Sequence, residues 1–213
     1  MKILIADDHA IVRAGILTTL RENELFTEFL ECETGEEALR ITDEQNPDYV
    51  FMDLSLPKKH GLVVIRELRQ KGFDGKIVVL TFHQEEEYIY KSYQAGANGY
   101  VKKVAAVSNL NRIVARIEKG ARFAVEGYDE EALERLLQSY RGKVTVSREF
   151  YGDVFLTARE REVLKGVLAG KTTAELAEDL GISIKTVNIY RGNLLTKYES
   201  KNMAELAGKV MKG

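Results

Sequence analysis

Short apolar runs alternate with amphipathic helical patterns over the first half of the chain. Lys2–Ala6, Tyr49–Met52 and Lys76–Leu80 are rich in Ile, Val, Leu and aromatic residues, which predicts strands that are buried on both faces. Between them, stretches such as His9–Arg21 and Val63–Gln70 carry apolar residues at helical spacing. Strands that alternate with helices of this length predict right-handed crossovers and a parallel α/β sheet.

Polar residues stand where these strands are predicted to end. Asp7 and Asp8 follow the first strand, and Asp53 follows the second. Thr81 follows the third, and Lys102 comes after a further short apolar run, GYV. In an open parallel sheet, ligands bind outside the carboxyl ends of the strands. We therefore expect these five side chains to meet at one site.

Three carboxylates that meet at one site repel one another unless a cation lies among them. Mg²⁺ prefers oxygen ligands and would supply that charge, with Asp7, Asp8 and Asp53 as its predicted ligands. A carboxylate can also attack a phosphoryl group and form an aspartyl phosphate. In this hypothesis Asp53 is the nucleophile, while Lys102 and Thr81 stabilise the transferred group. An acidic residue at a strand end is often only a helix N-cap, which is the alternative for Asp8, but capping does not explain the whole set.

Composition favours two modest domains in a reducing compartment. The chain has 213 residues, 45% of them apolar, which is enough for one α/β core and a second, smaller unit. Residues 1–120 are net acidic and residues 151–213 are slightly basic. This difference fits an acidic site in the N-terminal part and an anionic partner for the C-terminal part. The single cysteine, Cys32, argues against a disulfide framework and a Cys-rich zinc site. Without a signal peptide or a long apolar run, we expect a cytoplasmic protein that neither spans nor binds a membrane.

The domain boundaries can be predicted from the pattern. Ser108–Lys119 is the last amphipathic helix of a first domain, residues 1–120. Residues 121–153 are predicted to be a linker with a helix near Asp129–Tyr140, because the stretch that follows is polar and without steady period. Residues 154–213 form the second domain.

Three helices with capping signals are predicted at the start of the second domain. Thr157 with Glu160 and Thr172 with Glu175 have the spacing of capping boxes, and Ser183 would cap a third helix that runs to about Tyr198. Two short helices joined by a glycine turn predict a helix-turn-helix. Helix N-termini and lysines hold phosphates, whereas Asn and Arg can read base edges. The alternative is a small helical bundle for protein contacts; the lack of acidic residues from 185 to 197 favours DNA.

At the predicted acidic site the sequence resembles a known family. IADDH, FMDLSLPKKHG, VVLTFH and GANGYVKK are similar to the receiver domain of bacterial two-component response regulators. The resemblance implies a flavodoxin-like, doubly wound, five-stranded parallel domain that takes phosphate from a histidine kinase. It also implies that the backbone carbonyl of Ser55 is a metal ligand and that Tyr100 is a switch coupled to Thr81. Phe82 is bulkier than the residue that many receivers carry there, and we hypothesise that it shields the phosphoryl group from water.

The second domain resembles the LuxR-type DNA-binding domain, a small all-α unit, in LTAREREVL, AELAEDLGIS and KTVNIYRGNLLTKY. The whole chain is thus similar to NarL/FixJ-type regulators. The resemblance also implies that the helix Met203–Met211 helps to pair two subunits. The implied DNA-binding positions are Lys185, Thr186, Asn188, Ile189, Arg191, Gly192 and Lys197. Tyr190, Tyr198 and Gly192 depart from the family pattern, and a glycine inside a helix costs about 1 kcal/mol relative to alanine.

Together, these expectations describe a DNA-binding transcriptional regulator that is switched by phosphorylation of Asp53. It would bind two half-sites of double-stranded promoter DNA as a homodimer. It would not be an enzyme beyond its own phosphoryl transfer and dephosphorylation. One alternative is a regulator of the same architecture that works without phosphorylation. Another is an aspartyl-phosphate phosphatase, although a second acid for a leaving group is not apparent. A Rossmann enzyme is disfavoured because no glycine-rich turn follows the first strand.

Overall fold

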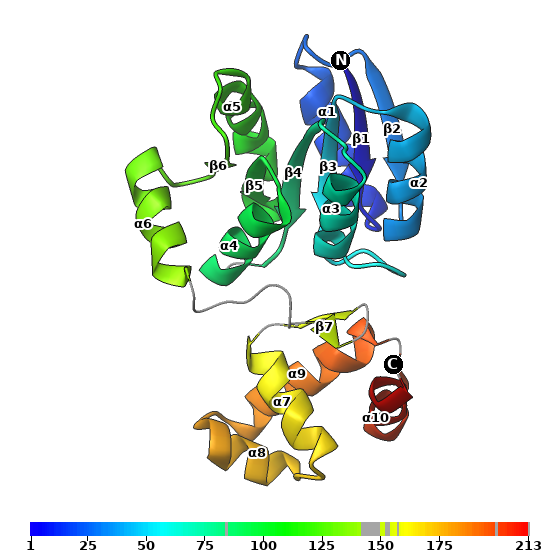
Figure 1. The fold of residues 1–213 in the computed structure, drawn as a ribbon, viewed down its shortest axis with the longest axis vertical. Coiled ribbons are helices and arrows are strands. Elements are labelled where there is room, and N and C mark those ends of the chain that lie inside the picture. The colour runs from blue at the N-terminus through cyan, green and yellow to red at the C-terminus, as the bar shows by residue number, and fades with distance from the viewer. Residues whose placement is uncertain (84, 142–149, 152–153, 157, 199, 213) are drawn as a thin grey trace. The chain divides into compact units, whose positions relative to one another are not determined.

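The computed structural model describes residues 1–83, 85–141, 150–151, 154–156, 158–198 and 200–212. The chain divides into two compact units, Met1–Val146 and Ser147–Gly213, and each is described by itself (Figure 1). None of the helices in these described ranges is long and apolar enough to cross a lipid bilayer.

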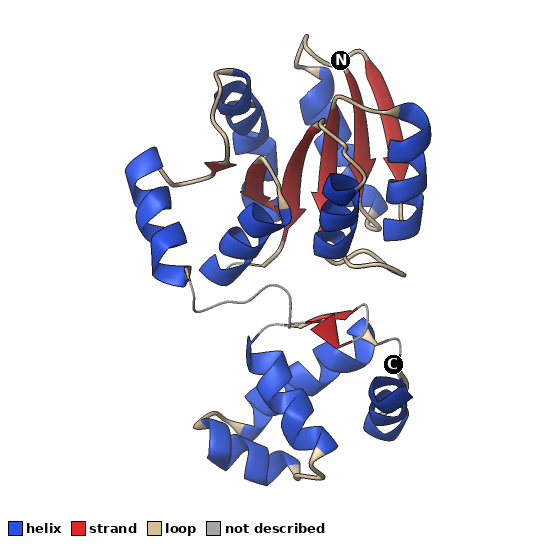
Figure 2. Cartoon of the chain, in the orientation of Figure 1, coloured by secondary structure: helices blue, strands red, loops and turns tan. Residues whose placement is uncertain are grey.

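The first unit is built on one parallel sheet (Figure 2). Its strands, in spatial order, are β2 (Glu28–Cys32), β1 (Lys2–Ala6), β3 (Tyr49–Asp53), β4 (Lys76–Thr81), β5 (Gly99–Lys102) and β6 (Ala124–Val125). The chain moves outward from β1 in both directions, so the strand order reverses between β1 and β3. A crevice forms outside the carboxyl ends of strands at such a reversal.

Five helices and a short 3₁₀ turn connect these strands. They are α1 (Ala10–Arg21), α2 (Gly35–Gln45), α3 (Gly61–Gln70), α4 (Glu86–Ala95), the 3₁₀ turn Lys103–Ala105 and α5 (Ala106–Glu118). Apolar residues of α1 and α5 pack with those of the central strands in one continuous core, while α3 lies between α2 and α4 on the other face. Every residue of β3 is buried, as the uninterrupted apolar pattern predicted.

A sixth strand and a further helix extend the predicted five-stranded domain. β6 pairs with β5, and the guanidinium of Arg116 donates to the carbonyl oxygens of Val125 (2.9 Å) and Tyr128 (3.0 Å). α6 (Glu130–Tyr140) begins at the Asp129 N-cap and buries Leu133 and Leu136. Residues 121–141 therefore pack on the first unit. A strand of two residues has no period, so the sequence carried no signal for it.

Two contacts hold α6 and the turn before it on α4. The ring of Tyr140 stacks on that of Tyr90 with centroids 5.7 Å apart, and the Tyr128 hydroxyl donates to Glu86 over 2.7 Å. The predicted helix is thus confirmed within one residue at its start. The rest of the predicted linker falls mainly on residues 142–149 and 152–153, outside the described residues, and the domain limits at 120 and 153 stay predictions.

The second unit is a helical bundle with a small hairpin. Its elements are β7 (Phe150–Tyr151), β8 (Val154–Phe155), α7 (Ala158–Leu168), α8 (Thr173–Leu180), α9 (Ile184–Lys197) and α10 (Met203–Lys212). Thr172 and Glu175 form the predicted capping box, and Gly181, at a φ of 62°, ends α8. Val187, Leu194 and Tyr198 are buried on the inner face of α9. The hairpin was not expected from an all-α prediction, and Thr157 lies outside the described residues.

Candidate functional site

The strand register brings two acidic residues together at the reversal of strand order. Ala6 pairs with Met52 across β1 and β3, so Asp7 and Asp53 stand side by side at the carboxyl edge. Their exposed fractions are 0% and 2%. Carboxylate oxygens of Asp7, Asp8 and Asp53 and a ring nitrogen of His9 all lie within 4.8 Å of one another. The structure thus gathers the three predicted acids and places the ring of His9 beside them.

Lys103 occupies the position that was predicted for Lys102. The Lys103 ammonium lies 2.8 Å from Asp7 Oδ2 and 2.7 Å from Asp53 Oδ2, and its side chain is fully buried. Lys102, the last residue of β5, is only half-buried, and it makes no ion pair within the part of the chain that the structure describes. The prediction that Lys102 lies in the acidic site is therefore wrong, and Lys103 takes its place.

The pairing register explains why the second lysine reaches the acids. Asp53 pairs with Leu80, and Leu80 pairs with Val101. Side chains of a strand alternate between the two faces of the sheet. Lys103 is two positions beyond Val101, so its side chain lies on the same face of the sheet as that of Asp53. The side chain of Lys102 lies on the opposite face. The register between strands was needed to choose between two adjacent lysines.

Burial raises the pKa of the Asp53 carboxyl above its ordinary value. The charge of Lys103 and its hydrogen bond act in the opposite direction, as does the backbone N–H of Ser55, which donates to Asp53 Oδ1 over 3.2 Å. The charge of Asp7 raises the Asp53 pKa further. Lys103 pairs with two of the three carboxylates gathered here, and this excess of acidic side chains favours a bound cation.

Thr81 and Tyr100 meet at one backbone position. Thr81 is fully buried at the end of β4, and its hydroxyl oxygen accepts a hydrogen bond from the N–H of His83 over 3.2 Å. The hydroxyl of Tyr100, a residue with 1% exposure, donates to the His83 carbonyl over 2.9 Å. Burial raises the pKa of Tyr100, so its hydroxyl stays a donor. The His83 ring stacks on Tyr88 of α4 at 3.9 Å. His83 therefore links both predicted switch residues to α4.

Phe82 lies at the rim of the acidic pocket. Its side chain is 53% exposed, and the Lys103 ammonium lies 5.1 Å from its ring centroid. The His9 ring meets it edge to face with centroids 6.4 Å apart. These positions are consistent with the predicted shielding of the pocket from water, which stays a prediction.

A second candidate surface is the outward side of α9. Lys185, Asn188, Ile189 and Gly192 are exposed there, and a Cβ placed on Gly192 would meet no atom within 4 Å. Ser183 caps the helix by accepting from the N–H of Thr186 over 3.0 Å, and Thr186 itself is partly buried. These residues form the exposed part of the predicted DNA-binding set.

Two cations of that predicted set point inward. Arg191 donates to the Thr173 hydroxyl over 3.0 Å, which ties α9 to α8. The Lys197 ammonium lies 2.7 Å from Glu160 of α7, a residue with 3% exposure. Lys197 thus joins two helices of the bundle, and its predicted contact with DNA stays a prediction. Its place in the last turn of α9 gave no sequence signal for the partner.

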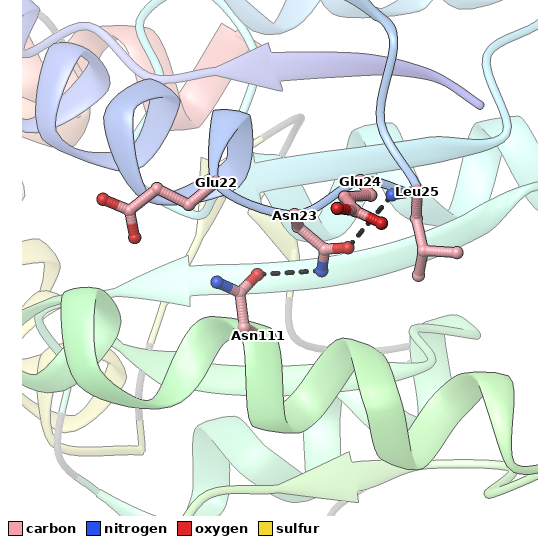
Figure 3. A pocket seen from close by; sticks show the side chains of 5 residues that line it. All are labelled: Glu22, Asn23, Glu24, Leu25 and Asn111. Carbon is pink, nitrogen blue, oxygen red and sulfur yellow. Dashed lines mark hydrogen bonds between the residues drawn. The ribbon is translucent and has the colours of Figure 1, made fainter.

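A separate open depression of about 640 Å³ lies where α1 ends (Figure 3). Its lining residues are Glu22, Asn23, Glu24, Leu25 and Asn111. The side-chain amide of Asn23 donates to Asn111 Oδ1 over 3.0 Å, which joins the end of α1 to α5. The acidic pocket lies at the opposite end of α1, so the two features are distinct.

Comparisons with known proteins agree with this geometry. Residues 3–117 match the model for the response regulator receiver domain, and residues 154–210 match that for bacterial regulatory proteins of the luxR family. An uncharacterized transcriptional regulatory protein, YhcZ of Bacillus subtilis, is 34% identical over 207 residues, covering 97% of this chain and 94% of the relative. The oxygen regulatory protein NreC of Staphylococcus haemolyticus is 31% identical over 215 residues, covering 100% and 97%.

Solved structures give the same picture. The response regulator RcsB of Salmonella typhimurium is 26% identical with a TM-score of 0.56, and the match covers 100% of this chain and 98% of that one. A structure of an RcsB–DNA complex is 25% identical with a TM-score of 0.57, covering 99% and 98%. The receiver of the putative response regulator NarL from Mycobacterium tuberculosis, at 24% identity and a TM-score of 0.53, shares the fold.

Proposed function

Because the chain belongs to the response regulators of two-component systems, with a receiver joined to a luxR-family DNA-binding domain, we propose that phosphorylation of Asp53 controls its binding to promoter DNA. The family consists of transcriptional regulators and not of classical enzymes, and a receiver implies a histidine kinase as partner. The observation that carries the proposal is the buried Asp53 carboxylate, with the Lys103 ammonium at 2.7 Å and Asp7 beside it.

The phosphoryl transfer is a substitution at phosphorus. A carboxylate oxygen of Asp53 forms the new P–O bond, the P–N bond of the kinase's phosphohistidine breaks, and the imidazole leaves with the electron pair of that bond. Asp53 must be ionised for this step. The Lys103 ammonium favours the ionised form and stays beside the acyl phosphate as its charge grows.

The donor set fits a divalent cation. Asp7 is completely buried, and its Oδ2 lies 2.8 Å from the Lys103 ammonium. Apart from this ion pair, Asp7 Oδ2 accepts no hydrogen bond of normal geometry from the described residues. With three carboxylates against one ammonium, the pocket needs further positive charge. Asp7, Asp8 and Asp53 would hold Mg²⁺, with the Ser55 carbonyl as an expected fourth ligand, and the ion would neutralise charge on the phosphoryl oxygens.

A path of contacts supports transmission of the phosphorylated state to the second unit. A phosphoryl group on Asp53 attracts the Thr81 hydroxyl, which currently accepts from the N–H of His83. His83 also holds the Tyr100 hydroxyl and stacks on Tyr88 of α4. α6, the last described element before the second unit, packs on α4 through the Tyr90–Tyr140 stack. Moving Thr81 thus changes the support of α6.

The exposed side of α9 is the proposed DNA-reading surface. Lys185 near the start of α9 suits a backbone phosphate, while Asn188 and Ile189 suit base edges. Solved structures describe RcsB bound to DNA and two RcsB dimers bound to two parallel DNAs. By analogy, we propose that a homodimer of this chain binds two half-sites about one DNA turn apart. We also propose that the protein acts in the cytoplasm.

The test uses the intact chain. DNA sequences are selected with and without a small phosphodonor and Mg²⁺, and the affinity for the selected sequence is then measured for wild type and for Asp53→Asn. We expect the phosphodonor to tighten binding by wild type and to leave the variant unchanged. Equal affinity in all conditions would support the rival, a regulator that works without phosphorylation. Lys102→Gln is the matched control and should respond like wild type.

A further inference from the structure

His9 stands within the acidic pocket although it is not part of the oxygen ligand set. Its Nδ1 lies 2.6 Å from Asp8 Oδ1 and 3.6 Å from Asp7 Oδ1. The side chain is 57% exposed, whereas the carboxylates of Asp7 and Asp53 are buried behind it. An imidazole nitrogen thus faces the carboxylates from the solvent side of the pocket.

The separations suit a single ion. Neighbouring ligands of an ion at about 2.1 Å lie about 3 Å apart, and opposite ligands lie about 4.2 Å apart. The four candidate atoms, from Asp7, Asp8, His9 and Asp53, span at most 4.8 Å, so small side-chain rotations bring all of them within ligand distance. Lys103 pairs with the Oδ2 atoms of Asp7 and Asp53, whereas Asp7 Oδ1 lies on the side of His9 and accepts its backbone N–H.

The type of donor decides which ion is preferred. Mg²⁺ is a hard cation that binds oxygen and retains water, and it gains little from an imidazole. Divalent ions of the later first transition row bind imidazole nitrogen well, and their affinities for mixed nitrogen and oxygen sites rise toward copper. A pocket of carboxylates with one imidazole at its mouth is therefore better matched to these ions than a pocket of carboxylates alone.

We propose that His9 Nδ1 is a metal ligand in the receiver pocket, and that through it the pocket binds divalent transition ions such as Zn²⁺ more tightly than Mg²⁺. The inference rests on the proposed function, since it uses the same carboxylates. Its consequence is competition, because a transition ion held by His9 takes the place of Mg²⁺ and blocks the approach of a phosphodonor from the solvent side.

The other two histidines are held elsewhere. His60 Nδ1 accepts the N–H of Leu62 at the start of α3, and the His83 ring stacks on Tyr88. The chain has three histidines, so its imidazole NMR spectrum is simple enough to assign by substitution. His9 is also the only histidine that joins an acidic cluster within the described ranges.

The experiment titrates the intact chain with Zn²⁺ or with Mg²⁺ and follows the imidazole signals by ¹H–¹⁵N NMR and the affinity by calorimetry. We expect Zn²⁺ to shift the His9 ring nitrogens and not those of His60 or His83. In His9→Ala the Zn²⁺ affinity should fall about 10- to 100-fold, while the Mg²⁺ affinity changes less than about twofold. His9→Gln should behave like His9→Ala, and urea unfolding of both variants checks that they are folded.

The outcomes separate this inference from the proposed function. Zn²⁺ and Mg²⁺ affinities that are both unchanged in His9→Ala would overturn the inference, as would Zn²⁺ shifts at His60 or His83 alone. Asp53→Asn should weaken both ions. If wild type bound neither ion, the magnesium part of the proposed function would fail together with this inference, whereas Mg²⁺ binding without a His9 effect would overturn the inference alone.

Discussion

The acidic pocket and the outward side of α9 use charge in opposite ways. In the pocket, Asp7, Asp53 and Lys103 are buried and paired with one another. On α9, two of the predicted cations, Arg191 and Lys197, are turned inward to hold neighbouring helices, and the outward side is left with Lys185 and polar or apolar residues. Pairing within the fold thus assembles the site in the pocket, whereas on α9 it draws two cations away from the outward side.

The largest effect should come from the two adjacent lysines. Removing one partner of a buried ion pair costs about 3–5 kcal/mol, because the remaining charges stay buried. Lys103→Met should therefore lower the free energy of unfolding by about that amount in urea without added divalent ions. Lys102→Met, the matched control, should change it by less than about 0.5 kcal/mol. Equal effects of the two substitutions would contradict the assignment of Lys103 to the pocket.

A second pair of lysines should separate stability from DNA binding. Lys197→Gln removes a 2.7 Å ion pair to the nearly buried Glu160, and we expect the second unit to lose about 1–3 kcal/mol of stability. Lys185→Gln should leave stability unchanged but weaken DNA binding and reduce the salt dependence of log K by about one. Thermal unfolding and salt titrations of DNA affinity measure the two quantities. A reduced salt dependence in folded Lys197→Gln would show that Lys197 contacts phosphate after all.

The contact between α4 and α6 should have a smaller effect. An aromatic pair contributes about 0.5–1.5 kcal/mol beyond its buried area. Tyr140→Ala removes the stack on Tyr90, whereas Tyr140→Phe keeps it. We expect faster amide hydrogen exchange in Glu130–Tyr140 for the alanine variant and wild-type exchange for the phenylalanine variant. If α6 exchanges equally in all three proteins, the stack does not hold α6 on α4.

Gly192 offers the smallest change. An exposed helical glycine costs about 1 kcal/mol relative to alanine, and nothing lies within 4 Å of the position of the added Cβ. Gly192→Ala should therefore raise the melting temperature of the second unit slightly. Its DNA affinity should stay within about twofold if Asn188 and Ile189 carry the base contacts, and a large loss would show that the α9 backbone itself approaches the DNA at Gly192.

The sequence predicted most of what depends on local pattern. Strand ends that carry Asp7, Asp53 and Thr81, the Thr172–Glu175 capping box and the buried face of α9 follow from periodicity and spacing. Choosing Lys103 over Lys102 required the register of β4 with β5, and the partner of Lys197 lies 37 residues away in sequence. Such pairings depend on tertiary structure and leave no periodic signal.

His9 and β6 were missed for a related reason. His9 was given no role in the acidic site from the sequence, but the start of α1 places it against the carboxylates. The two residues of β6 are a strand only because the edge of β5 offers them hydrogen-bonding partners. Both features belong to the assembled sheet and not to any segment by itself.

The most direct test of the account is mass spectrometry of the intact chain after incubation with acetyl phosphate and Mg²⁺. Wild type should gain one phosphoryl group, which peptide mapping should locate at Asp53. Asp53→Asn should gain none, and removal of Mg²⁺ with a chelator should abolish the gain in wild type. Phosphorylation at another residue, or none in wild type with Mg²⁺ present, would contradict the central claim that this pocket is a phosphoacceptor site.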